Sequence, residues 1–170
     1  LFAFNNAIPR YGALVITPYY NKPTQGGLYK HFATVAEGSP DFPICLYNVP
    51  GRTCVDLLPE TAARIADEFS NVVAFKEATG KVDRVSEMRS LTDKLDIFSG
   101  DDSLTLPMMS VGAVGVITVA GNLVPKMMLE MLGQFKDRDL AGARRCHDKL
   151  FPLMKGMFLE TNPIPIKSAM

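Results

Sequence analysis

The length, composition and charge of this 170-residue chain fit one globular domain and exclude several classes of partner. Apolar residues make up 47% of the chain, and no apolar run approaches the roughly 18 residues that a membrane-spanning helix needs. Eighteen basic residues balance eighteen acidic ones, so no strong field would attract nucleic acid or a membrane surface.

Short apolar runs alternate with helical patterns along the whole chain. The runs are rich in β-branched and aromatic residues, as buried strands are, and the segments between them have apolar residues at helical spacing. The predicted elements are, in chain order, strand 13–17, helix 28–37, strand 44–47, helix 59–69, strand 72–75, a helix with an apolar stripe at 82, 85, 88 and 91, strand 95–99, helix 103–111, strand 115–119, helix 125–136 and helix 139–160, with Pro152 as a candidate kink.

The repeated order of strand and helix predicts parallel βα units. Two architectures fit this order, an open doubly wound sheet and part of a (β/α)8 barrel. The glycine-rich turn G-x-G-x-x-G of a dinucleotide-binding sheet is absent. The nearest sequence, SVGAVGV, precedes a strand instead of following one.

Polar residues follow every predicted strand, in the segments TPYYN, YNVPGRT, KE, SGDD and AGN. In a parallel barrel the carboxyl ends of all strands share one face, so these side chains would converge on one mouth, which favours the barrel. Strand alternation predicts that Val72, Ala74 and Lys76 face the barrel interior, with Val73 and Phe75 on the other side.

An inward-facing Lys76 is the main candidate for chemistry. Burial disfavours the ammonium form, and a neutral amine can form a Schiff base with a ketone or an aldehyde. Tyr47, on the neighbouring strand, offers a phenol that can donate and accept protons. Arg52 offers a guanidinium group that can hold a carboxylate.

Each of these residues also has an ordinary structural interpretation. Lysines at strand ends are more often in surface ion pairs, although the adjacent Glu77 points to the opposite face and is a poor partner for Lys76. Tyr47 can be a rim aromatic with one wet end, and Arg52 can bind the last carbonyls of a neighbouring helix. Their joint arrangement at successive strand ends favours the catalytic interpretation.

Cysteine and histidine spacing argues against a metal site. Cys45, Cys54 and Cys146 show no C-x-x-C spacing, which is typical of reduced thiols in a cytoplasmic protein. His31 and His147 lie far apart, and neither has a second ligand at metal spacing. We therefore expect no metal ion.

Six motifs, in this order, resemble the dihydrodipicolinate synthase (4-hydroxy-tetrahydrodipicolinate synthase) family: ITPYYNKPTQGGLYKHF, LYNVPGRT, FKEATG, SGDD, GVITVAGN and NPIPIK. That family belongs to the pyruvate-dependent class I aldolases, with N-acetylneuraminate lyase. The resemblance covers about Gly12 to Lys167. It implies a TIM barrel and a lyase of lysine (diaminopimelate) biosynthesis that condenses pyruvate with L-aspartate 4-semialdehyde, without a cofactor. A pyruvate-releasing 2-keto acid aldolase is the alternative.

The resemblance also implies roles for particular residues. Lys76 falls on the lysine that forms the Schiff base with C2 of pyruvate, and Tyr47 on the tyrosine that transfers protons during imine formation. Tyr20 falls on a tyrosine that reaches across a dimer interface into the neighbouring subunit's proton relay. These are the three catalytic residues that we expect.

Three further positions are implied to bind substrate or effector. Arg52 falls on the arginine that engages the carboxylate of aspartate semialdehyde, a position where sialic acid lyases generally lack arginine. The backbone around Ile117 lies against pyruvate in relatives. Tyr19 lies where lysine-inhibited members line their allosteric cleft.

The chain also departs from the family pattern. The Gly-Thr-Thr-Gly-Glu loop, which supplies the threonines of the relay and of the pyruvate site, has no counterpart in the sequence. The five strands correspond to the last five of eight, so we expect residues 1–137 to form a partial barrel and residues 138–170 its last helix and a shortened C-terminal segment. Such a piece would expose two sheet edges, and an inactive half-barrel is a further alternative. The family also implies a homo-oligomer, a dimer of dimers.

Overall fold

A computed structural model describes residues 12–170 of the chain. Its centre is one parallel sheet in which each strand pairs with the next along the chain. The strands are β1 (Ala13–Ile16), β2 (Ile44–Asn48), β3 (Val72–Glu77), β4 (Asp96–Ser99) and β5 (Gly115–Val116). All five predicted strands are therefore present, but the last is much shorter than the expected 115–119, and a 3₁₀ helix begins at Ala120.

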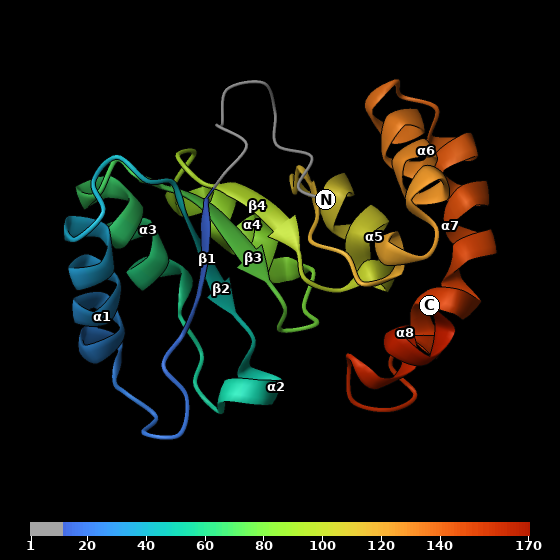
Figure 1. Ribbon diagram of the computed structural model, residues 1–170. Coiled ribbons are helices and arrows are strands. Elements are labelled where there is room, and N and C mark those ends of the chain that lie inside the picture. The colour runs from blue at the N-terminus through green and yellow to red at the C-terminus, as the bar shows by residue number, and fades with distance from the viewer. Residues whose placement is uncertain (1–11) are drawn as a thin grey trace.

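Helices connect the strands and continue beyond the sheet (Figure 1). In the figure α1 and α3 lie together on one side of the sheet, whereas α6 and α7 gather on the other side, beyond β4 and α5. The helices are α1 (Gln25–Glu37), α2 (Pro50–Thr53), α3 (Pro59–Glu68), α4 (Asp83–Leu91), α5 (Thr105–Ser110), α6 (Pro125–Lys136), α7 (Leu140–Gly156) and α8 (Ile164–Ala169), with 3₁₀ helices η1 (Asp102–Leu104) and η2 (Ala120–Asn122).

Some helix ends match the predicted ones and others differ. Helix α1 begins three residues earlier than expected, because Thr24 caps it by accepting a hydrogen bond from the backbone N–H of Gly27 at 3.3 Å. Helix α3 begins at Pro59 as predicted, since proline tolerates the first helical position. Pro152 lies inside α7, which ends at Gly156 and not at the expected residue 160.

A β-bulge in β3 changes which side chains face the interior of the sheet. Ile44 of β2 pairs with Val72, but the next residue, Cys45, pairs with Ala74. Val73 is therefore the extra residue of the bulge, and the simple alternation of side chains breaks at this point.

The bulge makes part of the predicted alternation wrong. Val72 packs with Phe75 in the core under the helices, whereas Val73 packs against Ala74 on the other face. Downstream of the bulge the prediction is correct, because Ala74 and Lys76 are two residues apart and share a face. Lys76 therefore lies on the face that would form a barrel interior.

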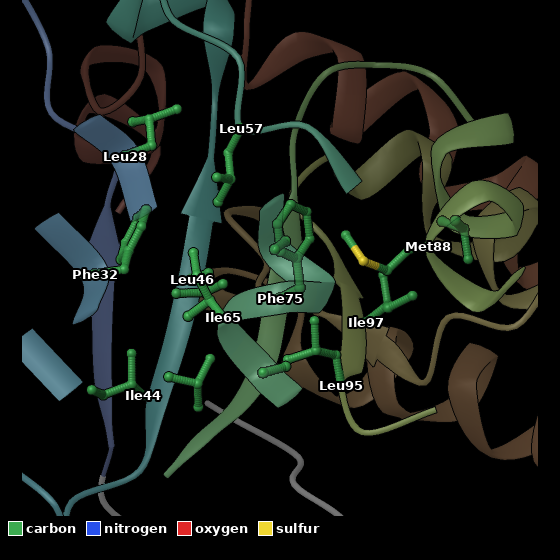
Figure 2. Close-up of a cluster of buried hydrophobic side chains, with 14 of the residues drawn as sticks. Leu28, Phe32, Ile44, Leu46, Leu57, Ile65, Phe75, Met88, Leu95 and Ile97 are labelled. Carbon is green, nitrogen blue, oxygen red and sulfur yellow. The ribbon is translucent and has the colours of Figure 1, made fainter. Parts of the chain in front are cut away.

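Most of the core lies between the sheet and the helices α1, α3 and α4 (Figure 2). Phe32, Leu46, Ile65, Phe75 and Ile97 are each no more than 1% exposed. Burial of such side chains stabilises the fold by about 1.5–3 kcal/mol each, so this layer fixes the strands in register. None of the helices in the described part of the chain is long and apolar enough to cross a membrane.

A smaller apolar cluster covers the opposite face of the sheet. It consists of the buried residues Cys45, Ala74 and Phe98, with Ile117 packed at its margin. Two of the three buried members, Cys45 and Ala74, have small side chains. This face therefore leaves room for the longer side chains at the carboxyl ends of β2 and β3.

Candidate active site

Lys76 and Tyr47 form a close pair at the carboxyl ends of β3 and β2. They are register partners in the parallel ladder, and the Lys76 Nζ atom lies 4.2 Å from the centre of the Tyr47 ring. Both side chains are half-buried. The sequence prediction that these two side chains lie next to each other is thus met by the geometry.

Burial lowers the pKa of Lys76 below the usual value for lysine. Cys45, Asp101 and Asp102 act against this shift, and the positive charge of Arg52 adds to it. A lower pKa raises the fraction of neutral amine, which is the nucleophilic form of the side chain.

Burial raises the pKa of Tyr47, with Arg52 lowering the pKa and Asp101 raising it. The phenol therefore keeps its proton near neutral pH and can donate it. A neutral amine beside a protonated phenol is a combination that can add to a carbonyl carbon while a proton moves to the carbonyl oxygen.

Arg52 lies in the short helix α2, within the connection that follows β2, and its side chain is exposed. Its Nη2 atom donates a hydrogen bond to the backbone oxygen of Asn162 at 3.1 Å, which joins this loop to the segment before α8. The guanidinium group makes no ion pair within residues 12–170. Its charge is thus free to bind an anion.

Ile117 lies immediately after β5 and is half-buried. Its backbone N–H donates to the oxygen of Ser99 at 2.9 Å, which extends the pairing of β4 and β5 by one residue. The side chain packs against the cluster of Cys45, Ala74 and Phe98. Ile117 therefore borders the same face as Lys76.

Tyr19 and Tyr20 do not join this pair. They are 66% and 89% exposed, in the loop between β1 and α1. Tyr20 has a φ of 67°, in a region of backbone conformation that is uncommon for a bulky residue. Its ring is thus held away from the rest of the described chain.

Sequence reasoning gave no role to two aspartates of the SGDD motif that border the site. Asp102 is 2% exposed, and its Oδ2 atom accepts hydrogen bonds from the backbone N–H groups of Val119 at 3.1 Å and Ala120 at 2.8 Å. Asp101 is half-buried, and burial followed by the charge of Asp102 raises its pKa. The adjacent pair of acids at a strand end was the available signal.

Across residues 12–170, no three His, Cys, Asp or Glu side chains are grouped so that they could hold a metal ion.

Comparisons with known proteins agree with this geometry. The model of the dihydrodipicolinate synthetase family matches residues 6–170. The 4-hydroxy-tetrahydrodipicolinate synthase of Persephonella marina is 55% identical over 159 residues, which are 93% of this chain and 54% of that protein. The chain thus spans about half the length of the curated relatives that it matches.

Solved structures show the same fold. Dihydrodipicolinate synthase from Aquifex aeolicus superposes with a TM-score of 0.90 at 51% identity, over 93% of this chain and 54% of that one. The chloride-inhibited enzyme of Acinetobacter baumannii, complexed with pyruvate, has a TM-score of 0.87 at 45% identity, again over 93% and 54%. The parallel α/β sheet is accordingly part of a TIM barrel, as predicted, and this chain belongs to the dihydrodipicolinate synthetase family.

Proposed function

We propose that this chain carries the Schiff-base half of a 4-hydroxy-tetrahydrodipicolinate synthase site, which condenses pyruvate with L-aspartate 4-semialdehyde. The observation that carries the proposal is the half-buried Lys76, with a lowered pKa, packed against the Tyr47 ring at the carboxyl ends of adjacent parallel strands. The membership of the family, with a solved relative complexed with pyruvate, supports this choice of first substrate.

In the proposed reaction the neutral amine of Lys76 adds to C2 of pyruvate. Tyr47 gives one proton and the amine nitrogen another to the former carbonyl oxygen, water leaves, and a protonated imine forms. The Tyr47 phenolate then takes a proton from the pyruvate methyl carbon, which gives an enamine because the imine nitrogen accepts the electron pair. That carbon then bonds to the aldehyde carbon of the second substrate. The lysine acts as the electron sink, so the proposed steps need no organic cofactor.

The remaining predicted residues have proposed roles around this centre. Arg52 binds the carboxylate of aspartate semialdehyde, which its charge favours, since it has no ion pair within residues 12–170. The backbone at Ile117 lies against pyruvate. Tyr20, held in an exposed and uncommon conformation, reaches into a neighbouring subunit, and Tyr19 beside it borders an effector site for lysine.

We also infer a homo-oligomer, a dimer of dimers, in the cytoplasm. Tyr19 and Tyr20 are large exposed aromatic side chains of the kind that interfaces bury, and they support the oligomer. One solved family member is a monomeric variant, so sedimentation of this chain is the appropriate test. The three cysteines are free thiols, as in proteins of a reducing compartment.

The proposal is tested by turnover with both substrates, comparing the unsubstituted chain with Arg52→Ala. Arg144→Ala is the matched control, because the Arg144 side chain is 80% exposed on α7 and its one ion pair within residues 12–170 is with Asp148. We expect Arg52→Ala to raise the half-saturating concentration of the semialdehyde at least about tenfold, as loss of a charged hydrogen-bonding partner does, and Arg144→Ala to leave it unchanged. Pyruvate release from a 2-keto acid, without condensation, would overturn the proposal in favour of an aldolase.

A further inference from the structure

The residues that follow Tyr47 and Lys76 are buried polar groups. Asn48 and Glu77 are 0% and 2% exposed, and they are register partners in the β2–β3 ladder. Since neighbouring strand residues point to opposite faces, both lie on the helix-covered side, directly behind the lysine and tyrosine.

Asn48 joins the end of β2 to the segment that follows α2. Its Nδ2 atom donates to Asp56 Oδ1 at 2.7 Å, and its Oδ1 atom accepts from the backbone N–H of Leu57 at 3.0 Å. Its backbone oxygen accepts from the N–H of Ala78, just after β3, at 3.0 Å. One residue therefore fixes three segments of the chain.

Arg84, in the first turn of α4, connects Asn48's partners to Glu77. Its Nη2 atom donates to Asp56 Oδ1 at 2.9 Å and to the backbone oxygen of Leu57 at 3.1 Å. Its Nε atom lies 3.8 Å from Glu77 Oε2, and the side chain is 11% exposed. The other carboxylate oxygen of Glu77 accepts from the backbone N–H of Thr79.

Burying these charged and polar groups costs free energy, so stability alone does not account for the network. Charges taken out of water lose hydration, and a well-packed apolar replacement is often as stable or more so. What the network provides is geometry, because it ties the carboxyl ends of β2 and β3 to each other, to the loop after Arg52 and to α4. A small shift between these ends would separate the Lys76 amine from the Tyr47 phenol.

We propose that Asn48, Asp56, Glu77 and Arg84 form a positioning network that holds Lys76 and Tyr47 in register for proton transfer during imine formation. None of the four touches the substrate in this scheme, and each acts through the two residues in front of it. The inference rests on the proposed function, since it concerns the same Schiff base.

The test is the rate at which borohydride traps pyruvate on Lys76, measured in a double-mutant cycle. Glu77→Gln keeps the acceptor for Thr79 but removes the charge that faces Arg84. Arg84→Lys keeps the charge but loses the Nη2 group that donates to both Asp56 and Leu57. Each variant is made alone and in a chain that also carries Tyr47→Phe. Rates are corrected for the folded fraction, measured by circular dichroism at the assay temperature.

We expect each single variant to lower the trapping rate about ten- to a hundredfold, as small misplacements of reacting groups do. In the Tyr47→Phe background the same substitutions should change the rate less than about twofold, because the proton donor that the network positions is already gone. If Arg84→Lys reduces the folded fraction, the isosteric Glu77→Gln still decides the outcome. Acetylation of Lys76 by a small acyl donor needs no phenol, so its rate should not fall.

Arg64→Lys and Glu68→Gln are the matched controls, because this pair joins the same charges at 2.9 Å on the exposed surface of α3. Neither should alter trapping. Equal losses with and without Tyr47→Phe, or equal losses of trapping and acetylation, would overturn the inference and leave the proposed function standing. Absence of trapping in the unsubstituted chain would overturn both.

Discussion

Gly100 lies just after β4 and packs against the end of β3, so replacing it by alanine tests how these two strand ends pack. The backbone N–H of Gly100 donates to the oxygen of Glu77 at 2.6 Å. A Cβ atom at this position would lie 2.5 Å from the Cβ of Ala78 and 2.9 Å from the oxygen of Glu77. Neither neighbour is the free end of a flexible side chain, so the backbone itself has to move.

The magnitude follows from three contributions. Overpacking of this kind costs about 1–3 kcal/mol, and the lengthened hydrogen bond to Glu77 adds about 1 kcal/mol. The smaller conformational freedom of alanine in the unfolded chain offsets about 0.5–1 kcal/mol. We therefore expect Gly100→Ala to lower the free energy of unfolding by about 2 kcal/mol.

Urea denaturation followed by far-ultraviolet circular dichroism measures this change. Gly133→Ala is the matched control, because Gly133 lies within α6 and a Cβ atom there meets no atom within 4 Å. Alanine is a better helix former than glycine, so the control should stabilise the protein by up to about 1 kcal/mol. An unchanged free energy of unfolding in Gly100→Ala would refute this close packing of the β3 and β4 ends.

Three further predictions concern the site and the core. Burial lowers the pKa of Lys76, so the rate of pyruvate trapping should rise with pH. It should reach half its maximum below pH ~10.4, the ordinary pKa of lysine. A midpoint at or above that pH would contradict the burial of Lys76. Phe75→Ala, at a site 1% exposed, should lower the free energy of unfolding in urea by about 3–5 kcal/mol, and a loss below about 1 kcal/mol would show that the ring is not in the core. Burial raises the pKa of Cys45 to about 12, so iodoacetamide at about pH 8 should label exposed Cys54 and spare Cys45 in peptide maps of the native protein.

The order of elements and the Lys76–Tyr47 pair follow from local patterns in the sequence. Apolar runs with β-branched residues mark strands, and parallel pairing brings residues at the ends of consecutive strands together. The position of Lys76 next to Tyr47 needed only this rule and the period of two along a strand.

The bulge at Val73 and the buried network behind the site required the structure. A bulge arises from the fit between two strands that are distant in sequence, and no single residue near Val73 marks it. No residue near Glu77 in the sequence indicates that Arg84 is its partner, because α4 brings the two together only in the folded chain. Arg52 looked like a carboxylate ligand or a helix cap, and its hydrogen bond to Asn162 joins segments 110 residues apart.

The most direct test of the central claim is the mass of the chain after incubation with pyruvate and borohydride, followed by peptide mapping. A reduced carboxyethyl adduct on Lys76, absent from Lys76→Arg and slower to form in Tyr47→Phe, is the predicted result. The matched control is Lys81→Arg, because Lys81 is an exposed lysine just beyond β3. Adducts spread over several exposed lysines, or no adduct on Lys76, would contradict a Schiff-base role for this residue.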